Sequence, residues 1–152
     1  PNTEGLRKLS SKEFLEDLIY EIDKEKLKLE KKYLKKVPIL FKLSPDESDE
    51  NLKNIIDLSL SNGISGFILT NTLKGEYLGI NGGISGELLK ERSNSVLKKV
   101  KKIVNNECIL ISSGGISSKS DAEERMSNGA NLIQIYTSFI YKGPEIIEEL
   151  LN

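Results

Sequence analysis

The chain has 152 residues, 38% apolar and 30% charged, which suffices for one domain with a core but not for a complete eight-unit β/α barrel of about 250 residues. Its 22 Lys and Arg nearly balance 23 Asp and Glu, so there is no global field to attract nucleic acid or an anionic membrane. One cysteine and no histidine exclude an internal disulfide, histidine zinc ligands and histidine-based triads. No apolar run approaches the ~20 residues that span a bilayer, so we expect the chain itself to be soluble.

The first predicted element is a helix that begins near Ser10, because Ser10 and Glu13 have the spacing of a capping box. Its apolar residues fall on one helical face: Phe14, Leu15, Leu18, Ile19 and Ile22. Between positions 24 and 36 the helix becomes rich in Lys and Glu, which is typical of a solvated face; a basic interaction surface is the alternative. The chain begins on Pro1 without an initiator methionine, so we interpret it as a segment that starts inside a loop of a longer protein.

Two strand–helix patterns follow this helix. The apolar run 37–43 predicts a strand that ends at a Pro-Asp turn, with Lys42 near its carboxyl end. The helix after it ends at Gly63, which can adopt a left-handed cap. A second strand, 66–69, then ends in three small polar residues, Thr70, Asn71 and Thr72.

A glycine-rich loop, predicted over 73–86, separates these units from the next helix. That helix carries an apolar stripe between 96 and 104 and leads to a strand over 109–111. The strand stops at two serines and the paired glycines Gly114 and Gly115, where the backbone can turn and approach a ligand closely.

The last part of the chain repeats the pattern once more. Ser118 and Asp121 form a capping box for a helix that ends near Gly129, and a buried strand is predicted over 131–136. A final helix begins at Pro144. The count is four strands, each followed by a helix and joined by parallel crossovers, preceded by one helix that lacks its own strand.

Polar residues follow all four strands at their carboxyl ends, which is where β/α barrels place their chemistry. Gly114 and Gly115, together with Tyr136 and Thr137, favour a phosphate site because they offer free amides and hydroxyls. The alternative is that Ser, Thr and Asn only end strands through their turn preferences, but Lys42 does not fit that explanation. The tyrosines do not alternate with basic residues as they do in nucleic-acid sites, so we expect no nucleic-acid partner.

Six segments are informative when taken together: PNTEGLR, FKLSPD, TNT, GGISGELL, SSGGISS with DAEERMSNGA, and IQIYTSFIYKGP. This combination, which covers nearly the whole chain, resembles the dihydroorotate dehydrogenases, specifically the quinone-linked class 2 enzymes. The resemblance implies an α/β fold that is the C-terminal half of a TIM (β/α)8 barrel, a single partial domain over residues 1–152 without its N-terminal half. It also implies FMN as cofactor and the oxidation of dihydroorotate to orotate in pyrimidine biosynthesis.

The resemblance assigns roles to particular residues. It implies substrate contacts for Asn2, Asn71 and Thr72. It implies flavin contacts for Lys42, Thr70, Ser85, Gly86, Gly114, Gly115, Tyr136 and Thr137. The serine that serves as general base in class 2 would lie just upstream of Pro1, so we expect no catalytic base within this chain.

The resemblance also implies partners outside the chain. These are the N-terminal half-barrel, and a quinone admitted by N-terminal helices, with the whole protein peripheral on the inner membrane. The loop over 73–81 is shorter than expected for a lid over the substrate. Two alternatives remain open: another FMN-dependent TIM-barrel enzyme, and a non-catalytic half-barrel that is a remnant or a phosphate- or flavin-binding module.

Overall fold

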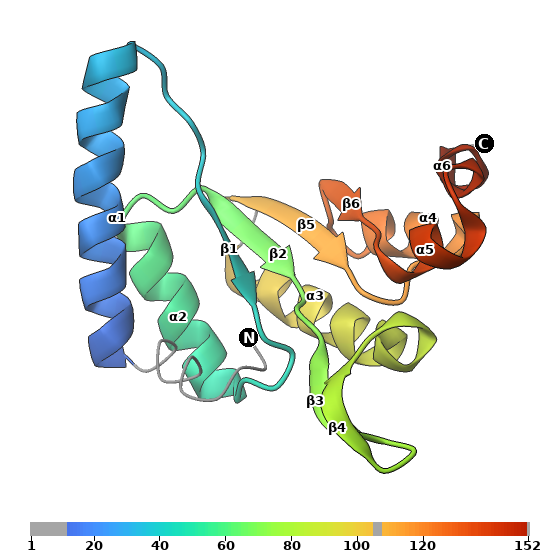
Figure 1. The fold of residues 1–152 in the computed structure, drawn as a ribbon. Coiled ribbons are helices and arrows are strands. Elements are labelled where there is room, and N and C mark those ends of the chain that lie inside the picture. The colour runs from blue at the N-terminus through green and yellow to red at the C-terminus, as the bar shows by residue number, and fades with distance from the viewer. Residues whose placement is uncertain (1–11, 105–107, 152) are drawn as a thin grey trace.

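The computed structural model describes residues 12–104 and 108–151, and its centre is a parallel four-stranded sheet (Figure 1). The strand order is β1-β2-β5-β6. The strands are β1 (Leu40–Leu43), β2 (Gly66–Leu69), β5 (Ile109–Ser113) and β6 (Leu132–Gln134). Because all four are parallel and follow one another across the sheet, their carboxyl ends lie along a single edge, as the sequence pattern predicts.

Helices connect and cover the strands. They are α1 (Lys12–Tyr33), α2 (Asp49–Ser61), α3 (Lys90–Val104), α4 (Lys119–Ser127), α5 (Thr137–Lys142) and α6 (Glu145–Leu151). The first three lie side by side, α2 packs between α1 and α3, and α3 contacts β2 and β5 (Figure 1). The helix α4 packs on β6 and α6, so it extends the helical layer to the far end of the sheet.

The hydrophobic core lies between this helical layer and one face of the sheet. Alternate strand residues supply the sheet side, with Phe67, Leu69 and Leu110 almost wholly buried. The helices supply the other side with Leu15, Ile19, Leu52, Ile55, Ile56, Val96, Leu97, Val100 and Val104. The helix α3 thus buries most of the stripe predicted from its sequence, whereas α1 buries a narrower stripe than predicted and leaves Phe14 and Leu18 exposed.

The opposite face of the sheet carries aliphatic side chains that none of the described helices covers. Strand register places Lys42, Ile68, Ile111 and Leu132 in one row across it, and Leu132 is 56% exposed. At the carboxyl edge, Lys42 Nζ lies 3.4 Å from the Oε1 atom of Gln134, although three strand spacings of about 4.8 Å separate β1 from β6. The sheet therefore curls towards this face, as the wall of a barrel does.

The segment 73–86, predicted to be a loop, is instead an antiparallel hairpin of β3 (Leu73–Tyr77) and β4 (Ile80–Ile84), followed by a 3-10 helix over Gly86–Leu89. The pairing of Tyr77 with Ile80 leaves a two-residue turn in which Leu78 and Gly79 both have positive φ. Such turns normally carry Asn or Asp first, and Leu at that position conceals the hairpin from sequence inspection.

The strand predicted over 131–136 is shorter and less buried than expected. It ends at Gln134, and the missed helix α5 begins at Thr137. The aliphatic run of β6 suggested burial on both faces, but the inner face of the sheet has no cover within the described residues, so Leu132 is exposed. The Ser118–Asp121 capping box and the left-handed glycines at 63 and 129 are confirmed, while the cap predicted at Ser10 lies outside the described residues.

Candidate functional site

An open pocket of about 550 Å³ lies at the carboxyl edge of the sheet. Its lining contains Lys42, Thr70, Asn71, Thr72, Ser85, Gly86, Gly114, Gly115, Tyr136 and Thr137, which are ten of the eleven predicted site residues. The eleventh, Asn2, lies outside the described residues. The fold thus gathers residues that are up to 95 positions apart in the chain, from Lys42 to Thr137, into one concave site.

The backbone after β2 is held as an extension of the sheet. The amide of Thr70 donates to the carbonyl of Ser113 at 2.8 Å, and the amide of Asn71 donates to the carbonyl of Leu43 at 2.8 Å. These bonds tie the segment to both neighbouring strands, so the positions of Asn71 and Thr72 at the pocket are fixed by the sheet rather than by a free loop.

The end of the hairpin meets the start of α5 on the other side of the pocket. Thr137 Oγ1 donates a hydrogen bond to Ser85 Oγ at 3.1 Å. Gly86 has a φ of +68°, and a Cβ there would come within 3.1 Å of Thr137 Cγ2. A larger residue at 86 would therefore be strained in its backbone and would press on the methyl group of Thr137, next to the hydroxyl that bonds Ser85.

The turn after β5 requires glycine at both of its positions. Gly114 and Gly115 have φ values of +109° and +72°. A Cβ on Gly115 would lie 2.5 Å from the Cα of Lys90, which is an impossible contact with the first residue of α3. The turn thus packs directly on the start of α3, and its other side borders the pocket.

Arg125 lies behind this turn and is completely buried. Its Nη2 donates to the carbonyls of Lys90 at 2.8 Å and Gly114 at 3.0 Å. Its Nη1 donates to Ser93 Oγ at 2.9 Å and approaches Ser112 Oγ at 3.4 Å. One side chain from α4 thereby joins the start of α3, the end of β5 and the glycine turn.

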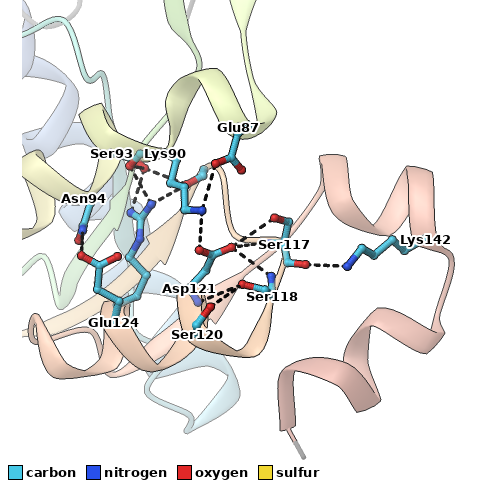
Figure 2. Close-up of polar contacts among 12 residues, drawn as sticks. Glu87, Lys90, Ser93, Asn94, Ser117, Ser118, Ser120, Asp121, Glu124 and Lys142 are labelled. Atoms are coloured by element: carbon cyan, nitrogen blue, oxygen red, sulfur yellow. Dashed lines mark hydrogen bonds and ion pairs between the residues drawn. The ribbon is translucent and has the colours of Figure 1, made fainter.

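An ion pair lies beside the turn, between Lys90 Nζ and Asp121 Oδ1 at 2.6 Å (Figure 2). The other oxygen of Asp121 accepts from the amides of Ser117 and Ser118. Burial opposes ionisation of Asp121, but the hydrogen bonds from Lys90, Ser117 and Ser118 prevail and lower its pKa from 3.8 to about 2. The hydrogen bonds to Asp121 and Glu87 raise the pKa of Lys90, so the pair is fully charged at neutral pH.

Lys142 of α5 fastens the same loop from the other direction. Its Nζ donates to the carbonyl of Ser117 at 2.8 Å (Figure 2). The same Nζ pairs with Glu149 of α6 at 2.9 Å. Lys142, Ser117 and Gln134 all line the pocket, although none of them is among the site residues predicted from the sequence. The alternation of β6 could have indicated Gln134, since a polar residue two positions before Tyr136 shares the inner face with Leu132.

Comparison with known proteins now identifies the family. The family model for dihydroorotate dehydrogenase matches residues 1–152, the whole chain. The chain belongs to the dihydroorotate dehydrogenase family. Among curated relatives, the dihydroorotate dehydrogenase (quinone) of Legionella pneumophila strain Corby is 39% identical and that of Pseudoalteromonas translucida is also 39% identical, each over the whole of this chain.

The same family is found among solved structures. A crystal structure of DHODH from Eimeria tenella in complex with ferulenol superposes with a TM-score of 0.90 at 32% identity, covering 99% of this chain and 45% of that one. A ligand-free DHODH structure from the same organism gives a TM-score of 0.86 at 31% identity, covering 97% of this chain and 46% of that one. These dihydroorotate dehydrogenases are TIM barrels, and the parallel sheet described above is part of one.

The chain spans about half the length of the curated dihydroorotate dehydrogenases it matches: 48% of the Legionella protein and 47% of the Pseudoalteromonas protein. Within residues 12–104 and 108–151, no helix is both long and apolar enough to cross a membrane. The same residues contain no group of three or more acidic or cysteine side chains placed to hold a metal ion. Dihydroorotate dehydrogenases depend in general on a flavin.

Proposed function

We propose that this chain supplies one side of the flavin and substrate site of a dihydroorotate dehydrogenase that oxidises dihydroorotate to orotate and passes the electrons to a quinone. The observation that carries the proposal is the gathering of ten family-motif residues around one pocket at the carboxyl edge of the parallel sheet. A pocket of about 550 Å³ has a size ordinary for a bound cofactor of this class.

FMN is the proposed flavin because the two sides of the pocket suit its two parts. The turn at Gly114 and Gly115 has no side chain to obstruct a phosphate, and Thr137 offers a hydroxyl beside it. Lys42 lies on β1, at the other end of the strand order, and its ammonium group would face the flavin ring. Bound FMN would accept a hydride from the substrate.

The residues of the chain would serve that chemistry by charge and by orientation. Negative charge develops on a flavin ring as it is reduced, and the fixed ammonium group of Lys42 would stabilise it. Asn71 and Thr72 would hold the substrate, since an amide offers both a donor and an acceptor to a planar carboxylated pyrimidine. The proton acceptor is proposed to be a serine outside this chain, as the family resemblance implies. The one carboxylate in the described pocket lining, Glu87, pairs with Lys90 at 3.1 Å.

The uncovered face of the sheet supports the assignment of this chain as the C-terminal half of a barrel. Ile68, Ile111 and Leu132 form a row of the kind that fills the interior of a closed barrel. Among the described residues, no strand pairs with the outer edge of β1 or of β6. An N-terminal half with four more strands would cover that row and pair with both edges.

Two further parts of the proposal concern the whole protein. The quinone would reach the flavin through helices that belong to the N-terminal half, and those helices would hold the enzyme peripherally on the inner membrane.

The proposal is tested with Asn71→Ala in the full-length protein that contains this chain, mixed anaerobically with dihydroorotate. When the wild type is mixed with dihydroorotate, we expect its flavin absorbance to fall as the flavin is reduced. In the variant we expect a KM for dihydroorotate that is about tenfold or more higher. Asn54→Ala, on the exposed surface of α2, is the matched control and should behave as the wild type. If dihydroorotate never reduces the flavin of the wild-type protein, the proposed oxidation is wrong and the half-barrel is a binding module instead.

A further inference from the structure

Arg125 is a buried cation that forms no ion pair with a described carboxylate. Its side chain is wholly inaccessible, yet within the described residues no carboxylate lies within ion-pairing distance of it. The acidic residues of its own helix pair with other cations: Asp121 with Lys90, Glu123 with Lys119, and Glu124 with Lys98. Glu124, Asp121 and Glu91 act on the guanidinium only at longer range. Buried charges in proteins are normally paired, so the unpaired guanidinium of Arg125 requires a functional explanation.

The hydrogen bonds of Arg125 determine which way one peptide unit faces. Nη2 holds the carbonyl oxygen of Gly114 at 3.0 Å, and Ser93 Oγ donates to the same oxygen at 2.8 Å. In a planar trans peptide the carbonyl and the following N–H point in opposite directions. The N–H of Gly115 therefore points away from Arg125, and the residues on that side of the turn border the pocket.

The positive charge of Arg125 would attract an anion to the same side of the turn as the N–H of Gly115 does. Burial lowers the pKa of the guanidinium, but an arginine stays protonated in proteins at neutral pH. Its positive charge lies behind a glycine turn that has no side chains to intervene, and the interior screens charge far less than water does. An anion in front of the turn would meet both an oriented N–H and this charge.

We propose that Arg125 is a positioning residue for the phosphate monoester of the cofactor, acting through the peptide between Gly114 and Gly115. This role rests on the proposed flavin function and adds a residue that never touches the ligand. Phosphate is the group recognised because it combines negative charge with oxygens that accept from backbone amides. A flavin that lacks the phosphate should not depend on Arg125.

The test compares FMN with riboflavin, which has the same ring system and no phosphate. Binding of each to the full-length protein, freed of flavin, is measured by quenching of flavin fluorescence for the wild type, Arg125→Met and Arg125→Lys. We expect Arg125→Met to weaken FMN about tenfold or more and to leave riboflavin nearly unchanged. Arg125→Lys keeps the charge but cannot hold two carbonyls in one plane, so its loss should be smaller.

Arg92→Met is the matched control. Arg92 is a half-buried arginine whose Nε donates to the carbonyl of Pro45 at 2.8 Å, on a turn that does not line the pocket. Its removal should leave the ratio of FMN to riboflavin affinity as in the wild type. A ratio reduced only in the Arg125 variants supports the positioning role.

Three results would overturn the inference. An unchanged ratio in Arg125→Met, or an equal weakening of both flavins, would make Arg125 a packing residue only. If circular dichroism shows that Arg125→Met does not fold, the test uses Arg125→Lys. An unchanged ratio of FMN to riboflavin affinity in Arg125→Lys would likewise make Arg125 a packing residue only. A wild type that binds neither flavin would overturn the proposed function and this role with it, and is thereby distinguished from the first two results.

Discussion

Lys42 projects from β1 onto the concave face of the sheet, where its Nζ donates to the amide oxygen of Gln134 at 3.4 Å. Lys42 is exposed and lines the pocket at the carboxyl end of its strand, which fits a ligand-facing function better than a packing role. Gln134 would restrict where the ammonium group can point, because its oxygen accepts one of the three ammonium protons.

We predict that Lys42→Ala in the complete protein slows flavin reduction by a factor of about 100 to 1,000, the usual effect of removing one preorganised stabiliser. The charge that Lys42 offsets develops during hydride transfer, so substrate affinity should change much less. Stopped-flow absorbance at saturating dihydroorotate measures the rate. Lys53→Ala, on the exposed side of α2, is the control, and reduction within a few-fold of wild type in Lys42→Ala would contradict the prediction.

Asp121 makes the stability of the loop beside the pocket depend on pH. Its pKa in the folded protein, about 2, is below the unfolded value of 3.8, so the carboxylate stabilises the fold above about pH 4. The contribution, about 2 kcal/mol, is lost as pH falls from about 5 towards 2. At neutral pH it is fully present.

We therefore predict that Asp121→Asn unfolds about 2 kcal/mol more easily at pH 7 and that the difference from wild type shrinks as pH falls towards 2. Urea titrations at a series of pH values measure it. Asp49→Asn is the control, because Asp49 pairs with Lys99 at 2.6 Å on the exposed surface, where ion pairs contribute little. A constant difference for Asp121→Asn at all pH values would be the contrary result.

At the scale of elements, two strand glycines differ in whether a neighbouring backbone occupies the space that a side chain would need. Gly66 begins β2, and a Cβ there would lie 2.1 Å from the carbonyl oxygen of Ile109 in β5. Gly82 in β4 has nothing within 4 Å. Both are strand glycines, so they differ mainly in whether another backbone occupies the space of a side chain.

We predict that Gly66→Ala destabilises the protein strongly, by about 3 kcal/mol or more, since β2 and β5 must separate to admit the methyl group. Gly82→Ala should be neutral or slightly stabilising, because alanine reduces the freedom of the unfolded chain. Thermal unfolding followed by circular dichroism compares the two. Equal melting temperatures would show that β2 and β5 are not as close as described.

The strands, their order of appearance and the edge that carries the site follow from local sequence signals. Apolar runs that stop at polar residues and helices that end in glycine report on their own neighbourhood, and the capping box at Ser118 and Asp121 is of this kind. The hairpin at 73–84 was missed because Leu78 occupies a turn position that local statistics assign to Asn or Asp. The helix α5 was missed because its six residues are too few to show a period.

The network around Arg125 lies beyond local signals for a different reason. In the sequence Arg125 resembles any charged residue in the last turn of a helix, where a cation is expected to face solvent. Only the fold shows that α4 turns this residue inward against Lys90, Ser93 and Gly114. The exposure of Leu132 is similar, because it depends on which strands lie beside it and not on its own segment.

At the scale of the whole molecule, the described chain presents surfaces that a complete barrel would cover. Within residues 12–104 and 108–151, no strand covers the outer edges of β1 and β6, and the inner face exposes aliphatic side chains such as Ile109 and Leu132. Open edges and apolar faces promote association between copies. The flavin ring would also lack a wall on the side where further strands close the barrel, so water would enter and weaken binding.

We predict that residues 1–152 on their own do not oxidise dihydroorotate, bind FMN poorly and self-associate. The turn at Gly114 and Gly115 would still offer a phosphate site, but the rest of the flavin would be solvated, and no base would take the substrate proton. Size-exclusion chromatography with absorbance at flavin wavelengths tests the chain alone. Mixing it with a separately produced segment that carries the other four strands should restore yellow colour and turnover together, because the same missing wall accounts for both losses. A monomeric, yellow and active preparation of residues 1–152 would contradict the assignment of this chain as half of the site.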